Sequence, residues 1–405
     1  MKTHHSSDDL NTDTPILALG GEVNTLAMAR HLGPKGVRIS VSGEHGCYAL
    51  SSRWCSEALP VPQGMSSHDY WFELLLAPGA DRYRDHIVMA MNDDAIDFVT
   101  KNAESLRGRC RLERFVPELR RALLDKQKTL ELAEQVGVPA PRHWAVKGPE
   151  DVLAAKDEIT FPVMVKPIHS HEFVQAFGRK LFIIKNDFDE VVARVRDATD
   201  RSIDVMAVEM VPGPDDLLSS YYTYLDDRGE PLYHFTKRII RRHPVNRGGA
   251  VYHATEWLPE TAEMGLRFLQ GIGWRGMANI EFKRDTRDGQ LKIIEVNSRL
   301  TAAHPLALRS GAPLDLIQYC VFTGQAHPTF GSYKEGMFYW YPLRDFRAFL
   351  ELKRAGELSF REWLSSLPRQ NVVLPLFNLS DLSPSLRRAA EIFGGLGRKV
   401  RASVK

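Results

Sequence analysis

Cysteine is scarce in this sequence, and the four cysteines are widely separated. Cys47, Cys55, Cys110 and Cys320 form no CxxC pair in a chain of 405 residues. A chain of this length buries enough apolar surface to fold without disulfide cross-links. The pattern therefore excludes a small disulfide-stabilised scaffold and predicts a protein of the reducing cytoplasm.

Long apolar runs and an excess of charge of one sign are also missing. No run approaches the roughly 20 apolar residues of a membrane helix, and the polar first 13 residues lack the apolar core of a signal peptide. The 53 lysines and arginines nearly balance the 51 acidic residues, so the overall charge attracts neither nucleic acid nor an acidic membrane. We therefore expect no transmembrane segment and no nucleic-acid partner.

The chain also lacks two common nucleotide-binding motifs in the structural context that each requires. The chain has no GxxxxGK[ST] phosphate loop, and its GxGxxG match at 271–276 follows a helical run and precedes a strand. A dinucleotide fingerprint needs the opposite order. The paired Gly20 and Gly21 more often make a tight turn than a phosphate-binding loop. An NAD-dependent dehydrogenase is therefore a weak alternative.

The first part of the chain alternates strands and helices. Apolar strands at 15–19, 37–41 and 86–91 are separated by helical segments. This alternation is typical of a parallel sheet. We expect a parallel α/β domain over residues 1–118.

A second domain begins with a helix from residue 117 that ends at Gly137. Mixed strands and helices follow, which predicts an α+β domain over 119–330 with a smaller lobe at about 140–212. Residues 331–405 indicate a C-terminal extension that is mostly helical.

The stretch 280–300 predicts a β-hairpin around which the second domain is organised. Two apolar runs flank a polar segment that ends in an Asp-Gly pair at 288–289, a strong turn signal. A turn there places Glu281 opposite Glu295, and Asn297 shares the face of Glu295 because side chains alternate along a strand. Two carboxylates and an amide oxygen on one face are ligands that Mg²⁺ accepts. The alternative is a surface hairpin with scattered charges, but apolar neighbours indicate half burial, where carboxylates without a cation are costly.

Single charged residues interrupt two other apolar strands. Lys166 lies in the strand 159–167, where a buried ammonium is costly unless it meets an anion such as phosphate. Its head could instead reach water at the strand end. Glu209 interrupts the strand 206–213, and two aspartates follow at 215–216. Free backbone groups and carboxylates there suit a heterocycle and a ribose, although a plain turn would look similar.

Basic residues gather in and after the strand 234–240. They are Lys237, Arg238, Arg241 and Arg242. Such a cluster is more often a solvated face than a binding site. Near a Mg²⁺ site it could hold an anionic substrate.

Taken in order, five motifs resemble those of the ATP-grasp superfamily, in particular its carboxylate-amine and carboxylate-thiol ligases with a preceding α/β domain. The resemblance covers about residues 15–325. The motifs are Asp125-Lys126 followed by GVPAP, FPVMVKP with Lys166, VEMVPGP with Glu209, GMANIEFKRD with Glu281, and EVNSRL with Glu295, Asn297 and Arg299. The resemblance implies an α/β and α+β fold, in which a parallel pre-ATP-grasp domain precedes a two-lobed ATP-grasp domain and a C-terminal extension.

The resemblance also implies roles for individual residues. Arg299 and Lys166 would act on the transferred phosphoryl group. ATP would be bound by Lys126, Lys166, Lys180, Glu209, Met210, Val211, Asp215, Asp216 and Arg238. Glu281, Glu295 and Asn297 would bind two Mg²⁺ ions, which Mn²⁺ could replace. The loop 168–180 has a single glycine where many relatives have a glycine-rich flap, which leaves the place of Lys180 open.

The implied activity is an ADP-forming ligase. A substrate carboxylate attacks the γ-phosphate of ATP, and an amine then displaces phosphate from the acylphosphate. A thiol acceptor, bicarbonate as the carboxylate, and an ATP-binding regulatory protein without catalysis are the alternatives. The partners would be small-molecule or peptide carboxylates and amines, with cell-wall chemistry and the ligation of a small metabolite as two options. A homodimer is compatible with the sequence, which does not determine the oligomeric state.

Overall fold

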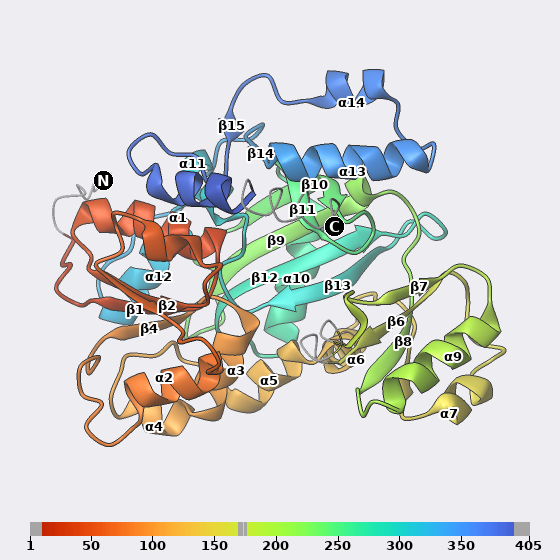
Figure 1. Cartoon of the computed structure of the whole chain (residues 1–405), viewed down its shortest axis with the longest axis horizontal. Helices are drawn as coiled ribbons and strands as arrows, with labels where there is room; N and C mark the ends of the chain where they lie inside the picture. The colour runs from red at the N-terminus through yellow and green to blue at the C-terminus, as the bar shows by residue number, and fades with distance from the viewer. Residues whose placement is uncertain (1–9, 169–172, 174–175, 393–405) are drawn as a thin grey trace, which may run out of the picture. The chain divides into compact units, whose positions relative to one another are not determined.

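A computed structural model describes residues 10–168, 173 and 176–392 (Figure 1). The described chain forms two compact units. The first contains residues up to 117, 299–340 and 370 onward, and the second contains 118–298 and 341–369. The sequence predicts a first boundary at residue 118. The residues expected to form one C-terminal extension are instead shared between the units.

The first unit is built on a parallel sheet in the order β3-β2-β1-β4. Its strands are β1 (Ile16–Leu19), β2 (Ile39–Gly43), β3 (Glu57–Pro60) and β4 (Ile87–Ala90). The helices are α1 (Val23–Leu32), α2 (Ser67–Leu75), α3 (Asp93–Lys101), α4 (Ala103–Arg107), α11 (His304–Ser310) and α12 (Leu314–Thr323), and the short strands β14 (Phe338–Trp340) and β15 (Val372–Val373) pair in parallel. The predicted parallel α/β domain is confirmed.

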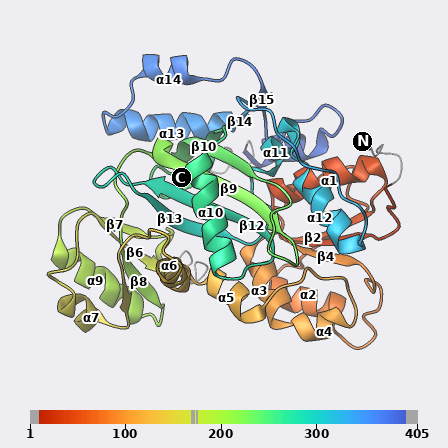
Figure 2. The same cartoon turned by 180° about the vertical axis from the view of Figure 1, so that it is seen from behind.

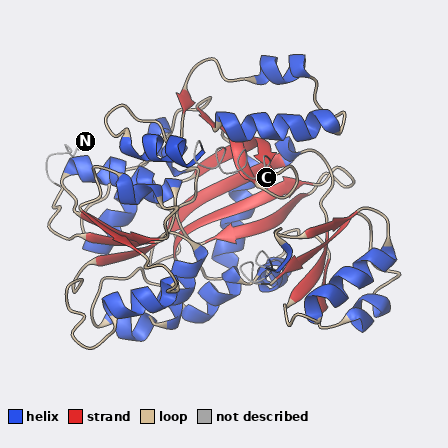
Figure 3. Ribbon diagram, viewed as in Figure 1, coloured by secondary structure: helices blue, strands red, loops and turns tan. Residues whose placement is uncertain are grey.

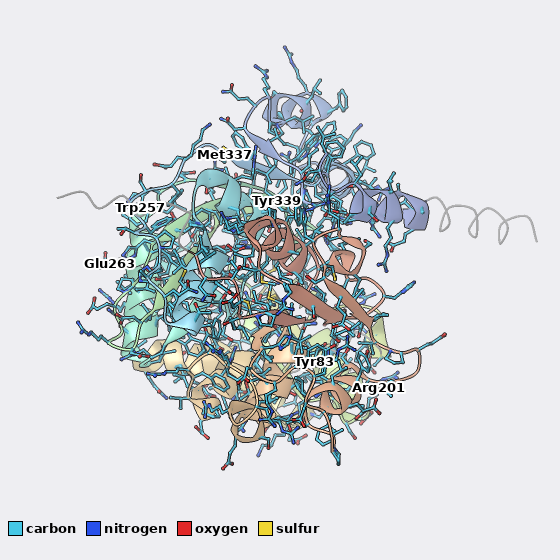
Figure 4. All side chains as sticks on the ribbon, turned by 90° about the vertical axis from the view of Figure 1, so that its left-hand side faces the viewer. Tyr83, Arg201, Trp257, Glu263, Met337 and Tyr339 are labelled. Carbon is cyan, nitrogen blue, oxygen red and sulfur yellow. The ribbon has the colours of Figure 1, made fainter. Side chains whose placement is uncertain are left out.

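Apolar strand residues explain this core. Leu17 and Leu19 of β1 are fully buried and pack with Trp71 and Phe98 of the helices on one face. Tyr83, labelled in Figure 4, is buried with them, and its hydroxyl donates to Glu57 (Oη to Oε2, 3.0 Å). One face of the sheet is therefore covered by these apolar side chains, as is typical of a parallel sheet.

The second unit contains an antiparallel sheet in the order β13-β12-β9-β10-β11. Its strands are β9 (Leu218–Leu225), β10 (Phe235–His243), β11 (Gly249–Thr255), β12 (Gly276–Arg284) and β13 (Leu291–Asn297). Helix α10 (Pro259–Gly271) lies across one face of this sheet (Figure 2). That face carries the apolar residues of the strands, among them Tyr221, Ile280 and Phe282, which are fully buried. The opposite face of the sheet is not covered by α10 and can carry polar side chains.

The smaller lobe of this unit has a separate antiparallel sheet in the order β5-β8-β6-β7 (Figure 3). Its elements are β5 (His143–Val146), α7 (Pro149–Ala154), β6 (Val163–Pro167), β7 (Phe182–Ile184), α9 (Phe188–Thr199) and β8 (Val205–Glu209). Two helices precede it, α5 (Pro117–Leu124) and α6 (Lys126–Gln135). They differ from the single predicted helix because Asp125 accepts hydrogen bonds from the amides of Gln127 and Lys128 and so caps a new helix.

The segment 341–369 adds α13 (Pro342–Arg354) and α14 (Phe360–Ser366) to the second unit. Buried Asp345 of α13 accepts from Arg241 of β10 at 2.6 and 3.2 Å. This pair explains why the helix belongs to the sheet rather than to a separate extension. Within the part of the chain that the structure describes, no helix is long and apolar enough to cross a membrane.

Candidate active site

The hairpin β12–β13 has the register that its turn predicts. Glu281 lies opposite Glu295, and Asn279 lies opposite Asn297. Gly289 adopts a positive φ of 70° in the turn, which an Asp-Gly pair accepts at low cost. The two carboxylates therefore project from neighbouring strands on the same face.

A row of side chains crosses four strands at this level. Glu295 of β13 pairs with Glu281 of β12, Glu281 pairs with Ser220 of β9, and Ser220 pairs with Lys237 of β10. Residues directly opposite each other in an antiparallel sheet share a face. Two acids, a hydroxyl and an ammonium thus line the face that α10 does not cover.

The acids and the amide fit a hard divalent cation. Glu281 is half-buried, Glu295 is exposed, and Asn297 is 8% exposed. Asn297 Nδ2 donates to Asn279 Oδ1 at 3.3 Å, and oxygen is the amide atom suited to Mg²⁺. The described residues contain no group of three or more His, Cys, Asp or Glu that could hold a metal. Two carboxylates and one amide therefore suit a cation that takes its other ligands from phosphate and water.

Lys237 was not singled out from its basic run by the sequence, yet the structure buries it to 2% exposure in this row. Burial lowers the pKa of Lys237 to about 8, and the Glu281 carboxylate opposes that shift. Ser220 beside it is fully buried, and its hydroxyl has no hydrogen-bond partner among the described residues. Burial of an ammonium and a hydroxyl is costly unless they form hydrogen bonds, and an anionic, oxygen-rich ligand would supply the acceptors.

Arg238 lies on the face of the sheet that α10 covers. It precedes Ile239 and follows Lys237 in β10, so alternation places it on the side of α10. Its Nε lies 2.8 Å from Glu256 Oε2. The structure therefore does not bring Arg238 together with Glu281, and alternation along the strand was the signal that separates Lys237 from Arg238.

Lys166 and Lys126 form a second basic group in the same unit. Lys166 lies in β6, and Lys126 is the first residue of α6. Desolvation and then the neighbouring Lys126 charge lower the pKa of Lys166 to about 8, while Glu295 opposes the shift. The predicted lysines are thus electrostatically coupled to each other and to a predicted metal ligand.

Glu209 ends β8 and has a carboxylate that is already engaged. It accepts from the Arg142 amide at 3.2 Å and from Thr160 Oγ1 at 3.0 Å, and Arg287 also donates to it. Despite burial, these bonds hold the pKa of Glu209 below its ordinary value. Met210 donates its amide to the Pro162 carbonyl at 2.9 Å, and Val211 is buried. The Glu209 side chain therefore fixes this segment, and only backbone groups here suit the recognition of a base.

The two ribose candidates differ. Asp215 is buried and accepts from Arg242 at 2.6 and 2.9 Å and from the Asn246 amide at 3.2 Å. Asp216 is exposed. Asp216 is therefore the better placed of the two to accept a hydrogen bond from a ligand.

Lys180 is exposed in the segment just before β7. The loop 168–180 includes residues 169–172, 174 and 175, which lie outside the described residues. The prediction that this loop covers ATP therefore stays a prediction.

Arg299 belongs to the first unit, where its Nε lies 2.8 Å from Asp93 Oδ1 at the start of α3. It lines a cavity of about 290 Å³ together with Gly20, Gly21 and Asn92. Adding a Cβ to Gly21 would bring it within 2.1 Å of Thr25 Oγ1, so this turn requires glycine. The tight-turn interpretation of the glycine pair is therefore supported.

The cavity lies at the carboxyl ends of β1 and β4. Strand β1 has β2 on one side and β4 on the other, so the strand order changes direction at β1. Such a change of direction is where α/β sheets bind ligands. Glu22, Glu44 and Asp94 also line it. The cavity thus offers both a guanidinium and carboxylates to a small ligand.

The chain is similar in sequence to several known proteins. Residues 257–327, which include β12 and β13, match the family model of the carbamoyl-phosphate synthase L chain ATP binding domain. The D-aspartate ligase of Enterococcus faecium is 25% identical over 313 residues, 70% of each chain. The D-alanine--D-alanine ligase of Pseudomonas entomophila is 31% identical over 187 residues, 43% of this chain and 54% of the relative.

Solved structures show the same fold at low identity. N5-carboxyaminoimidazole synthetase from Staphylococcus aureus, complexed with ADP, gives a TM-score of 0.61 at 15% identity, covering 81% of this chain and 82% of that one. Biotin carboxylase from Campylobacter jejuni gives 0.61 at 16%, covering 80% and 74%. These similarities in sequence and fold agree with the resemblance to the ATP-grasp superfamily that the sequence motifs predict.

Proposed function

We propose that this protein is an ATP-dependent ligase that joins a carboxylate to an amine and releases ADP and phosphate. The observation that carries the proposal is the row Lys237, Ser220, Glu281 and Glu295 on one face of the antiparallel sheet. It combines metal ligands with phosphate-binding groups. Electrostatic stabilisation of this kind dominates catalysis of phosphoryl transfer.

Each residue has a defined task in the proposed reaction. Glu281, Glu295 and Asn297 would hold Mg²⁺, which when bound neutralises phosphate charge and orients the γ-phosphoryl group. Lys166, Lys126 and Lys237 would place ammonium groups against the phosphates. The substrate carboxylate oxygen bonds to the γ-phosphorus as the bond to ADP breaks. The two-ion stoichiometry and the use of Mn²⁺ stay predictions.

In the second step the amine nitrogen attacks the acyl carbon, phosphate leaves, and the nitrogen loses a proton. We propose that the cavity around Arg299 binds an amino-acid substrate, since its guanidinium suits a carboxylate and Glu22, Glu44 or Asp94 suits an ammonium. Arg299 is oriented for such a contact by Asp93. The contact of Arg299 with the transferred phosphoryl group, which the family resemblance implies, stays a prediction.

The stereochemistry of the substrate is a finer proposal. D-aspartate ligase and D-alanine--D-alanine ligase are both named for D-amino acids, which supports a D-amino acid as one substrate of this chain. The homodimer that the sequence allows and the cytoplasmic location that it predicts both stay predictions. Sedimentation velocity would test the first.

The test is ADP release with Mg-ATP and a panel of paired amino acids, D and L forms side by side, with mass spectrometry of the product. We expect ADP and an amide-linked product with at least one D-amino acid. Product formation with thiols or bicarbonate instead would move the protein to those alternatives. Tight Mg-ATP binding without ADP release across the panel would contradict catalysis and favour a regulatory role.

A further inference from the structure

The connection that leaves β8, residues 209–213, is held at both ends by basic residues of the hairpin β12–β13. At its start, Glu209 accepts from Arg287, and Lys292 Nζ lies 4.0 Å from Glu209 Oε2. At its end, Lys283 Nζ donates to the Gly213 carbonyl at 2.6 Å. One hairpin therefore contacts both ends of the segment that the resemblance assigns to the adenine.

These basic residues are themselves fixed by a buried acid. Asp285 is fully buried and accepts from Arg287 at 3.0 and 2.5 Å and from Lys292 Nζ at 2.7 Å. Lys283 and Lys292 are only 3% and 8% exposed. A branched and desolvated network of this kind is more rigid than isolated surface ion pairs. Isolated surface ion pairs contribute little to the free energy of unfolding.

Backbone packing reinforces the contact. Gly213 has a φ of +98°, and a Cβ there would lie 2.8 Å from Thr286 Cγ2 in the hairpin turn. The positive φ requires glycine at this position, and the backbone of Gly213 lies close to the Thr286 side chain. Side-chain bonds and backbone packing both join residues 209–213 to the hairpin.

We propose that the turn end of β12–β13 is a clamp that sets the position of segment 209–213 relative to Glu281 and Glu295 on the same two strands. Arg287 is its positioning residue for recognition of the nucleotide base. The inference rests on the proposed function. The base and the phosphates of one nucleotide are covalently linked, so their binding groups must lie at matching positions. Displacement of segment 209–213 therefore weakens nucleotide binding, although no residue that contacts the ligand is removed.

The test compares Arg287→Met with Arg284→Met. Both arginines lie in the hairpin and have similar side-chain exposure, 41% and 42%, but Arg284 contacts Glu260 and the Gly289 carbonyl rather than residues 209–213. Titration calorimetry would measure the Kd of Mg-ATP and of Mg-tripolyphosphate, which lacks the base. We expect Arg287→Met to weaken ATP binding about tenfold, the usual scale for a lost bond to a charged group. Tripolyphosphate binding should not change, Arg284→Met should resemble the wild type, and Arg287→Lys should restore part of the affinity.

A second variant keeps the test decisive if Arg287→Met does not fold. Glu209→Gln has the same size, keeps one acceptor oxygen for the Arg142 amide and can donate its NH2 group to Thr160 Oγ1, but it removes the charge that Arg287 contacts. It should weaken ATP about threefold, again without affecting tripolyphosphate. Unchanged ATP affinity, or equal weakening of both ligands, would overturn the clamp. A wild-type protein that binds no Mg-ATP would instead refute the proposed function.

Discussion

The two ends of the β12–β13 hairpin carry acids in opposite settings. At the turn end, Asp285 is bonded directly to Arg287 and Lys292. At the open end, Glu281 and Glu295 lie opposite each other, and their charges oppose the lowering of the pKa values of Lys237 and Lys166. The same residue types thus build a structural network at one end and a ligand site at the other.

This contrast shows what separates a site from a scaffold. Acids that are bonded directly to bases keep their charge neutralised within the protein, and their removal costs stability. Facing carboxylates repel each other until a cation joins them, so their removal should cost activity instead. Substitutions at the two ends should therefore divide cleanly between catalysis and stability.

The largest effect is expected for Glu295→Gln at the open end. Removal of a metal-ligating charge should lower kcat/KM for the ligase reaction about a thousandfold, the upper range for one electrostatic contact. Because Glu295 is exposed, the free energy of unfolding should change by less than about 0.5 kcal/mol. Steady-state kinetics and urea unfolding would measure the two quantities.

Asp288→Asn is the matched control at the turn end. Asp288 is exposed and lies 3.3 Å from Lys292 Nζ. We expect its kcat/KM to stay within about twofold of the wild type, as for most surface changes away from a site. A loss equal to that of Glu295→Gln would remove the distinction between the two ends.

Asp285→Asn should lower stability more than activity. It leaves Arg287 and the buried Lys292 without their central anion, which should lower the free energy of unfolding by about 3 kcal/mol. Arg287 first, and then Lys292, hold the pKa of Asp285 below its ordinary range. Its stabilisation is therefore complete above the unfolded pKa near ~4 and is lost as the pH falls below that value. Urea unfolding at pH 7 and pH 3 should show the difference between variant and wild type shrinking, and equal stability at pH 7 would contradict the network.

Lys237→Met tests the assignment of the sheet faces. Loss of the buried ammonium should lower kcat about a hundredfold, whereas Arg238→Met on the other face should change it less than about threefold. Single-turnover kinetics would compare the two neighbours. The reverse ranking would mean that the row across the four strands is not the active face.

The smallest effect concerns pH. Burial lowers the pKa values of Lys166 and Lys237 to about 8, so both lose protons as the pH rises through 8 in the free protein. Bound phosphates favour the charged ammonium, so Mg-ATP binding should take up protons near pH 8.5 and weaken about tenfold by pH 9.5. Calorimetry in two buffers of different ionisation enthalpy would measure this uptake, and Lys166→Met should reduce it. Proton release on binding would contradict the role of these lysines.

The open end of the hairpin could be predicted from the sequence because its information is local. The Asp-Gly turn fixes which residues face each other, and Glu281 and Glu295 are only 14 positions apart. Lys237 was missed as a site residue because its face depends on the pairing of β10 with β9 and of β9 with β12. Those registers are not encoded in the basic run itself.

The clamp and the grouping of residues 341–369 with the second unit could not be predicted for the same reason. Arg287 and Glu209 are 78 positions apart, and nothing in either strand marks them as partners. Asp345 joins the second unit through Arg241, 104 positions away. A local pattern predicts α13 as a helix but not the sheet that it contacts.

The most direct test of the proposed phosphoryl-transfer site is a crystal structure with Mn²⁺ and a non-hydrolysable ATP analogue, with anomalous scattering to locate the metal. We expect a manganese peak bound by Glu281, Glu295 and Asn297, with the phosphates beside Lys166 and Lys237. A peak elsewhere, or phosphates on the face that carries Arg238, would contradict the assignment of this hairpin as the phosphoryl-transfer site.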